Sequence, residues 1–391
     1  MLSFNRKYIV HIFLFVFSTS ISCFIADDGK NWLIISMMLI MPFSLILKRK
    51  FYLCDIFIFS SVFVLLFNLM FAQDANIKWF SVLYILAFFV SFFTYVSLLD
   101  YAQYSIYDFT KLIKFIIYSY CVVLFLQQVC VLLNIPIINS INYDANVSVF
   151  KLNSLALEPS WTGRVVALLM LCFLMCNDKI QGIKISLRQS FIDNQKLWLA
   201  FLWVQFTSIS VTCILTTLIL FSRFLRFKEF ILSLLFMMGL IFILEYTDTM
   251  IWQRILAFSE AVITLDKDNI INADGSGAVR LVSYMNSFSV VSLSSFEDFF
   301  GYYDVYNQKT DTLYIYEAFG GLLTTWLLYG AGFFLIFCAF SMYIVIDIRE
   351  PVTFIYWILL VFFYSIGIKI IWLTLIFFYT FKKTSLDLSK S

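Results

Sequence analysis

The chain has 391 residues, of which 62% are hydrophobic and 13% are charged. Soluble domains are about 45 to 50% apolar and about 25% charged, so this composition excludes a water-soluble globule. The net charge of +2 indicates neither a nucleic-acid partner nor a strongly acidic one. One membrane crossing takes about 20 apolar residues, so the apolar content suffices for about a dozen helices. We therefore expect an all-α, polytopic helical membrane protein, with residues 1–391 forming one integral membrane domain.

The polar links between apolar runs predict which side of the membrane each link faces. In the first half of the chain the runs lie at 8–26, 31–47, 53–72, 79–99, 115–134 and 156–176. Basic residues occupy every second link, first at Arg6 and Lys7 and then at 48–50, and cytoplasmic links are rich in Lys and Arg. Six crossings would thus place the N-terminus in the cytoplasm and the segment 135–155 outside.

Two later apolar stretches are long but interrupted. Residues 197–221 have a polar middle at 207–210 and basic residues at both ends. We favour a hairpin that turns near this polar middle, which a membrane tolerates only inside protein or beside a cavity; a single crossing is the alternative. Residues 352–381 are expected to form two short helices that turn near Gly367 and return the C-terminus to the cytoplasm. The expected total is about twelve membrane helices.

The longest polar segment, residues 247–312, carries nine acidic and four basic residues, and a segment of this kind belongs outside the membrane. Connections longer than about 15 residues are usually functional or disordered. Apolar residues recur here at helical spacing, for example at Leu281, Tyr284 and Phe288. This spacing predicts that the segment is folded and lies on the membrane.

The start of the sixth apolar run combines a helix start with an arginine. Pro159 suits the first position of a helix, whose N–H groups and positive dipole end would then face outward and favour a bound anion. Arg164 would lie about 7.5 Å deeper, where a guanidinium usually faces a polar cavity or a partner. We favour an anion-binding role for Arg164; the alternative is that it snorkels or pairs with Glu158.

A second arginine lies at a predicted helix start in the segment 247–312. The stretch 274–280 is typical of a Gly-rich turn with Ser276 as a cap, which would place Arg280 in the first helical turn. Two arginines on one side of the membrane suit a diphosphate, because the planar guanidinium binds phosphate oxygens in pairs and keeps its charge. Glu317, at the edge of the next run, is either a general base or an ordinary interfacial acid.

No metal site and no cofactor are expected. The cysteines lie in or beside apolar runs, as small buried residues do, and Cys172 and Cys176 lack the further ligands of a zinc site. The single histidine is His11, in the first apolar run, where we expect it to pack between helices. A histidine-dependent mechanism in the segment 247–312 is therefore excluded.

Five elements follow one another in the sequence: a Glu-Pro-Ser element (Glu158, Pro159, Ser160), a Ser/Thr hairpin (Thr207, Ser208, Ser210), a Ser-Gly-x-x-Arg-like element (Ser276, Gly277, Arg280), a Phe-Gly pair (Phe300, Gly301) and a Glu-x-x-Gly-Gly entry to the next helix (Glu317, Gly320, Gly321). Their order resembles the O-antigen polymerase (Wzy) family over roughly residues 150 to 330 and, by topology, over the whole chain. The chain departs from the family at Tyr303, where a second glycine is expected.

The resemblance implies that a growing glycan passes from undecaprenyl diphosphate to a new lipid-linked repeat unit at the periplasmic face of the bacterial inner membrane. Arg164 and Arg280 would bind the diphosphate, whose developing charge they stabilise as it leaves. A carboxylate would take the proton of the acceptor hydroxyl, with Glu158 and Glu317 as the candidates. The expected partners are the undecaprenyl-diphosphate-linked oligosaccharide and membrane lipids; whether a chain-length regulator protein binds is left open.

Other functions remain as alternatives. An O-antigen ligase of the same superfamily is expected to carry a histidine in the long external loop, and this chain has none there. A flippase or transporter for the lipid-linked unit would suit broken helices and intramembrane charge, but the sequence has no internal repeat. A third alternative is a membrane scaffold without catalytic activity.

Overall fold

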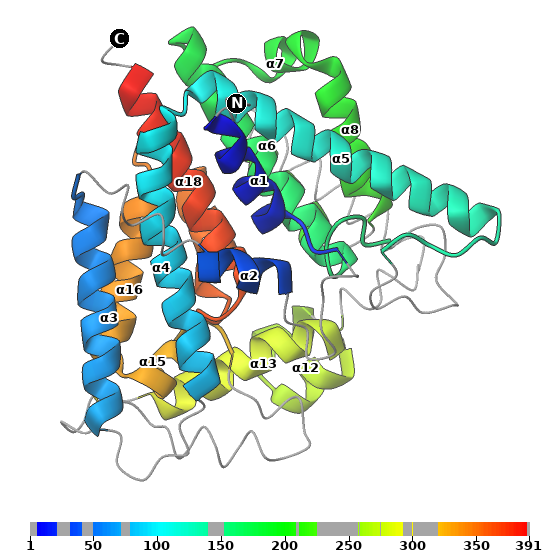
Figure 1. Cartoon of the computed structure of the whole chain (residues 1–391). Helices are drawn as coiled ribbons and strands as arrows, with labels where there is room; N and C mark the ends of the chain where they lie inside the picture. The colour runs from blue at the N-terminus through cyan, green and yellow to red at the C-terminus, as the bar shows by residue number, and fades with distance from the viewer. Residues whose placement is uncertain are drawn as a thin grey trace.

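The computed structural model describes residues 6–21, 32–40, 50–71, 79–139, 152–208, 211–224, 257, 259–273, 275–291, 299 and 320–388. This part of the chain is helical and contains no strand apart from one isolated bridge between Asp347 and Glu350. The molecule is a bundle of helices, with α12 and α13 lying across one end of it (Figure 1).

Four described helices contain segments long and apolar enough to cross a membrane. They are α3 (Leu53–Phe71), α4 (Trp79–Ala102), α5 (Ile106–Leu132) and α6 (Pro159–Gln181). Other helices accompany them: α1 (Lys7–Ser18), α2 (Trp32–Ile40), α7 (Leu187–Asp193), α8 (Gln195–Thr207), α9 (Val211–Ser222), α12 (Lys267–Ala273), α13 (Gly275–Val290), α15 (Leu323–Tyr329), α16 (Ala331–Val345), α17 (Val352–Trp357) and α18 (Lys369–Leu388). This all-helical fold is compatible with a helical membrane protein, and the total of about twelve crossings stays a prediction.

Helix α6 lies at the centre of the bundle. Every residue from Thr162 to Cys176 is buried, and the helix packs against α5, α8, α9 and α18. A helix that is apolar on all sides belongs inside a large protein or a membrane. Its first residues are less enclosed, because Glu158 is exposed and Pro159 and Ser160 are partly buried.

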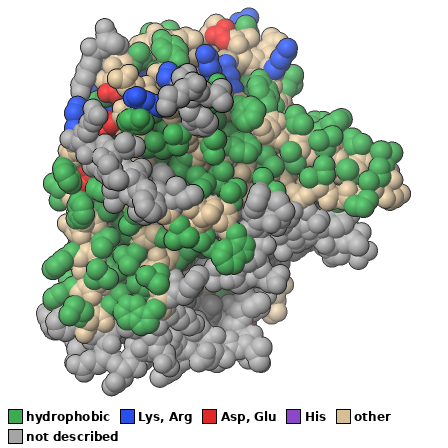
Figure 2. Space-filling view, viewed as in Figure 1, with side chains coloured by type: hydrophobic (Ala, Val, Ile, Leu, Met, Phe, Trp, Pro, Cys, Tyr) green, Lys and Arg blue, Asp and Glu red, His purple; other side chains and the backbone are tan. Residues whose placement is uncertain are grey.

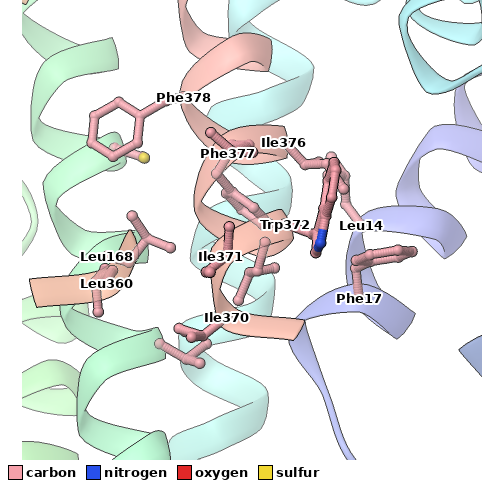
Figure 3. Close-up of a cluster of buried hydrophobic side chains, with 14 of the residues drawn as sticks. Leu14, Phe17, Leu168, Leu360, Ile370, Ile371, Trp372, Ile376, Phe377 and Phe378 are labelled. Carbon is pink, nitrogen blue, oxygen red and sulfur yellow. The ribbon is translucent and has the colours of Figure 1, made fainter. Parts of the chain in front are cut away.

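An aromatic and aliphatic core joins the first helices to the last. The Trp372 ring of α18 stacks on Phe88 of α4 with 5.3 Å between ring centroids and meets Phe89 edge-on at 4.9 Å. Figure 3 shows Trp372 beside Leu14 and Phe17 of α1. Aromatic pairs in these geometries stabilise beyond the area they bury, so α18 is held firmly in the bundle.

The hairpin predicted within residues 197–221 is confirmed. Helices α8 and α9 have 13 and 12 residues, so each is about 20 Å long and shorter than the apolar core of a bilayer. Trp198, near the start of α8, stacks on Phe221, near the end of α9, with 5.7 Å between ring centroids. The start of α8 and the end of α9 therefore lie side by side, as in a hairpin.

Charged side chains gather at the end of the bundle where α1 begins and α18 ends, which we call the terminal end (Figures 1 and 2). Ion pairs there join distant segments: Lys7 binds Asp108 at 2.7 Å, and Lys383 binds Asp100 at 2.9 Å. The opposite end, where α12 and α13 lie, is called the α13 end.

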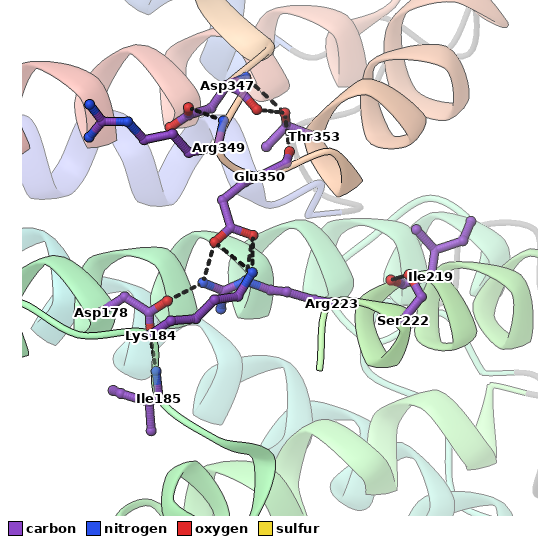
Figure 4. A network of polar contacts seen from close by, with 10 residues as sticks. All are labelled: Asp178, Lys184, Ile185, Ile219, Ser222, Arg223, Asp347, Arg349, Glu350 and Thr353. Atoms are coloured by element: carbon purple, nitrogen blue, oxygen red, sulfur yellow. Dashed lines mark hydrogen bonds and ion pairs between the residues drawn. The ribbon is translucent and has the colours of Figure 1, made fainter. Parts of the chain in front are cut away.

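A second ion cluster at the terminal end fixes the end of the hairpin (Figure 4). Arg223, directly after α9, donates to Glu350 at 3.0 Å and also binds Asp178 of α6. Lys184 adds a further contact to Glu350 at 3.2 Å. Burial alone would raise the pKa of Glu350, but hydrogen bonding and charge from Arg223, aided by Lys184, outweigh it and hold this pKa below its usual value.

The last part of the chain is interrupted close to the predicted position. Helix α17 continues as a π-helix, η5 (Ile358–Phe362), and α18 begins at Lys369, so the break at 363–368 includes Gly367. A further break, which the sequence did not predict, separates α15 from α16 at Gly330, whose φ is +85°. Pi-helical segments inside helices are frequent at functional sites.

Candidate functional site

The start of α6 has the predicted form. Glu158 is the N-cap residue in extended conformation, and Pro159 is the first helical residue. The segment before it, residues 152–156, is buried. Hydrogen bonds satisfy the buried backbone of Ser154: its N–H donates to Gln127 Oε1 at 2.8 Å, and Asn139 Nδ2 donates to its carbonyl oxygen at 2.6 Å. These bonds anchor the N-terminus of α6 inside the bundle.

Arg164 is buried, with 3% of its surface exposed, so it does not snorkel. Its Nε donates to Ser160 O and its Nη2 to Ser160 Oγ, both at 2.8 Å. Ser160 Oγ donates in turn to Glu158 Oε2 at 3.2 Å. Arg164 and Glu158 are therefore linked through Ser160, with Glu158 at the exposed end of the chain of contacts.

Two adjacent aromatic rings contact the Arg164 guanidinium. Its central carbon lies 5.4 Å from the ring centroid of Trp161 and 5.0 Å from that of Tyr364. The two rings are themselves in edge contact, with centroids 6.2 Å apart. A guanidinium over aromatic faces is stabilised electrostatically, more strongly where water is excluded. The site thus holds a buried cation by cation–π contacts and by hydrogen bonds to Ser160.

The tip of the α8–α9 hairpin lies against the same turn of α6. Gln205 Nε2 donates to Gly163 O at 2.9 Å, and Cys213 Sγ lies 3.6 Å from Pro159 O. A Cβ at Gly163 would lie 1.9 Å from Cys213 Sγ, so only glycine permits this approach. The predicted hairpin therefore reaches the predicted anion site, a contact that the sequence did not indicate.

The other two predicted site residues are only partly within the described chain. Arg280 lies in α13, one helical turn before Tyr284, and its side chain is outside the described part, as is all of Glu317. The predicted helix start is wrong in detail, because α13 begins at Gly275 and Arg280 lies in its second turn. Only one residue separates α12 from α13, and Gly275 and Gly277 both lie within α13. These glycines are therefore part of a helix and do not form the predicted Gly-rich turn.

The Gly-Gly element is the surface on which α13 packs. Gly320 N–H donates to Ser283 O at 3.0 Å, and Ser287 Oγ donates to Gly320 O at 3.1 Å. Gly321 has a φ of +71°, and a Cβ there would lie 2.0 Å from the Tyr284 ring. Glycine is needed here both for the backbone conformation and for the close approach of α13.

A partly buried lysine lies behind the arginine site. Lys369 Nζ donates to the backbone oxygens of Val16 and Thr19 at the end of α1, and to Ser20 Oγ at 3.2 Å. A cavity of about 10 Å³, room for about one water molecule, is lined by Lys369 and Trp161 among others. The sequence showed Lys369 as an interruption of an apolar stretch and gave no sign of its neighbours.

A larger cavity of about 460 Å³ lies at the terminal end, lined by Lys50, Asp100 and Lys383 among others. This cavity is far from the start of α6, and its volume alone does not indicate a ligand or a reaction.

Among the described residues, no group of three or more His, Cys, Asp or Glu side chains is arranged to hold a metal ion.

Comparisons of the chain with protein-family models, with curated proteins and with solved structures gave no match.

Proposed function

We propose that the chain is a glycosyltransferase of the O-antigen polymerase type. It would transfer a glycan from undecaprenyl diphosphate to the non-reducing-end hydroxyl of a lipid-linked repeat unit. The observation that carries this proposal is the buried Arg164 near the N-terminus of α6, in contact with the rings of Trp161 and Tyr364. Two features that favour an anion, a helix N-terminus and a guanidinium, coincide there.

The proposed reaction is a displacement at the anomeric carbon. The acceptor hydroxyl oxygen bonds to that carbon as its bond to the diphosphate oxygen breaks, and the electron pair leaves with the diphosphate. The hydroxyl proton passes to a carboxylate, Glu158 or Glu317. The cations of Arg164 and Arg280 stabilise the charge that develops on the leaving group. Since the protein residues supply both functions, the reaction is proposed to need no cofactor.

The proposed orientation places the terminal end in the cytoplasm and the α13 end in the periplasm. The basic residues of the terminal end, among them Lys7, Lys184 and Lys383, support this because cytoplasmic segments are rich in Lys and Arg. The isoprenoid tail of the carrier would lie in the bilayer of the bacterial inner membrane. Its diphosphate would reach Arg164 from the periplasmic side.

The O-antigen ligase alternative is less favoured. His11, the single histidine, lies in α1, where its ring meets that of Tyr104 edge-on at 5.5 Å. Tyr104 lies two residues after the end of α4 at the terminal end, far along the bundle from Arg164. A flippase would need no reacting hydroxyl and no leaving group. Formation of longer glycans by the purified protein therefore distinguishes a glycosyltransferase from a flippase.

Two experiments test the proposal. In a deletion strain, lipopolysaccharide with a single repeat unit on the core is expected; lipopolysaccharide with no repeat unit would instead indicate a ligase or a flippase. Purified protein given a defined undecaprenyl-diphosphate-linked repeat unit should produce longer lipid-linked glycans and release undecaprenyl diphosphate. Absence of both products, with correctly folded protein in a bilayer, would overturn the proposal.

A further inference from the structure

The corner between η5 and α18 touches both of the helices that carry the predicted arginines. We define this corner as Phe362, Phe363 and Tyr364. Tyr364 lies under the Arg164 guanidinium at 5.0 Å. The Tyr284 ring of α13 contacts Phe362 and Phe363, with centroids 5.5 and 5.3 Å apart. The corner is thus a shared support for the start of α6 and for α13.

Tyr364 contacts the Arg164 guanidinium from outside α6. Ser160 and Trp161 belong to the same helix as Arg164, so they move with it. Tyr364 is the described aromatic contact of this guanidinium that comes from another part of the fold. A planar cation is held parallel or inclined to a ring face by the ring quadrupole, so displacement of Tyr364 would release one face of the guanidinium.

Backbone hydrogen bonds join the corner to η5 and to the Gly-Gly element that supports α13. Phe363 N–H donates to Ile358 O and Tyr364 N–H donates to Val361 O, both at 3.1 Å. Leu322 N–H, next to the Gly-Gly element that supports α13, donates to Phe362 O at 2.8 Å. Movement of α13 away from Gly320 and Gly321 would therefore disturb the same backbone that carries Tyr364.

We propose that Tyr364 is a positioning residue for Arg164. Through Tyr364, the orientation of this guanidinium depends on the packing of α13 against the corner. The consequence for catalysis rests on the proposed function: Arg164 would be oriented for a diphosphate only while α13, which carries Arg280, is seated on the corner. Substrate binding and loop docking would then be coupled without any direct contact between the two arginines.

The first test needs no ligand. The full chain, labelled with ¹⁵N-arginine in detergent micelles, should show a slowly exchanging Nε–H signal for Arg164, assigned by its loss in Arg164→Lys. Tyr364→Phe, which keeps the ring, should preserve the signal, whereas Tyr364→Leu should shift it and speed its exchange. Tyr284→Ala leaves both Arg164 and Tyr364 intact and should cause the same change. Signals unchanged in both Tyr364→Leu and Tyr284→Ala would overturn the inference.

Tyr343→Leu is the matched control, because Tyr343 also lies near a cation, with Lys382 Nζ 5.9 Å from its ring centroid, but at the terminal end. It should leave the Arg164 signal unchanged. A change as large as that of Tyr364→Leu would mean that the signal reports general loosening, and would also overturn the inference.

The second test measures binding of farnesyl diphosphate to the same variants, with farnesol as the uncharged comparison. Tyr364→Leu should bind farnesyl diphosphate roughly 3- to 30-fold more weakly, with Tyr364→Phe and Tyr343→Leu unchanged and farnesol unaffected throughout. Equal affinity of wild type and Tyr364→Leu would overturn the positioning role. If wild type prefers farnesol or binds neither, the proposed function fails, and the arginine signals still decide the inference about Tyr364.

Discussion

Arg223 and Glu350 form a two-point contact across 127 residues of sequence, with Nε–Oε2 at 3.0 Å and Nη2–Oε1 at 3.2 Å. The Arg223 side chain is 1% exposed and that of Glu350 is 13% exposed. Arg223 also binds Asp178, near the C-terminus of α6. A single crossing by residues 197–221 would have left Arg223 at the other end of α6, so this contact closes the hairpin.

We predict that Arg223→Ala strongly destabilises the protein. Removing one partner of a buried pair leaves the other charges buried and uncompensated, at a cost of about 3 to 5 kcal/mol. Unfolding by denaturant in detergent, followed by tryptophan fluorescence, measures this loss. Lys184→Ala is the control, since the Lys184 side chain is 52% exposed and exposed pairs contribute about 0 to 1 kcal/mol. Equal effects of the two substitutions would show that burial does not govern this cluster.

The same pair predicts a loss of stability in acid. The pKa of Glu350 in the folded protein is held below its ordinary value of 4.5 by Arg223 and Lys184. The unfolded chain therefore takes up a proton first as the pH falls. The contribution of Glu350 is complete above pH 4.5 and is lost as the pH falls through the lower folded value. Unfolding curves of wild type should weaken in this range, and those of Glu350→Gln should show less of this dependence.

Local patterns predicted the breaks and starts of helices but not their neighbours. The polar middle at 207–210, Pro159 at the start of α6 and Gly367 at the last break are local signals, and each lies at an observed helix boundary. The contact between Arg164 and Tyr364 joins residues 200 positions apart, and no local pattern encodes it. The central burial of α6 was equally hidden, because lipid-facing and protein-facing sides of a membrane helix are both apolar.

We predict that Gly163→Ala loosens the hairpin from α6. The added Cβ would lie 1.9 Å from Cys213 Sγ and 2.7 Å from Cys213 Cβ, so one helix must shift. Overpacking of this kind costs about 1 to 3 kcal/mol, measurable as a lower thermal midpoint in detergent. Cys213→Ala in the same chain removes the closer of the two contacts and should restore part of the stability.

Gly367→Ala is the control for this prediction. A Cβ there would meet no atom within 4 Å, and Gly367 has no positive φ. It should therefore leave the thermal midpoint nearly unchanged. No rescue by Cys213→Ala would mean that Gly163 acts through something other than the contact with α9.

Arg164→Ala and Arg280→Ala are each predicted to abolish long-chain polymer while single repeat units are still made and exported. Loss of one group that stabilises a developing negative charge lowers a rate by about 100-fold or more. Polysaccharide ladders on gels, with equal membrane levels of each variant, measure the outcome. Arg349→Ala, an exposed arginine at the terminal end, should give a normal ladder. Normal ladders from both site variants would remove the site assignment.

Lysine at either position should not restore the ladder. Its ammonium keeps the charge but lacks the planar fork that binds two phosphate oxygens, and at position 164 it also changes the guanidinium contacts with Trp161 and Tyr364. The double variant Arg164→Ala, Arg280→Ala gives the sharpest result. If the two arginines bind one diphosphate, their effects on the polymerisation rate of purified protein should be less than additive, because groups that act on one charge depend on each other. Fully additive losses would mean that they act on separate groups, and the proposed shared site for the diphosphate would be wrong.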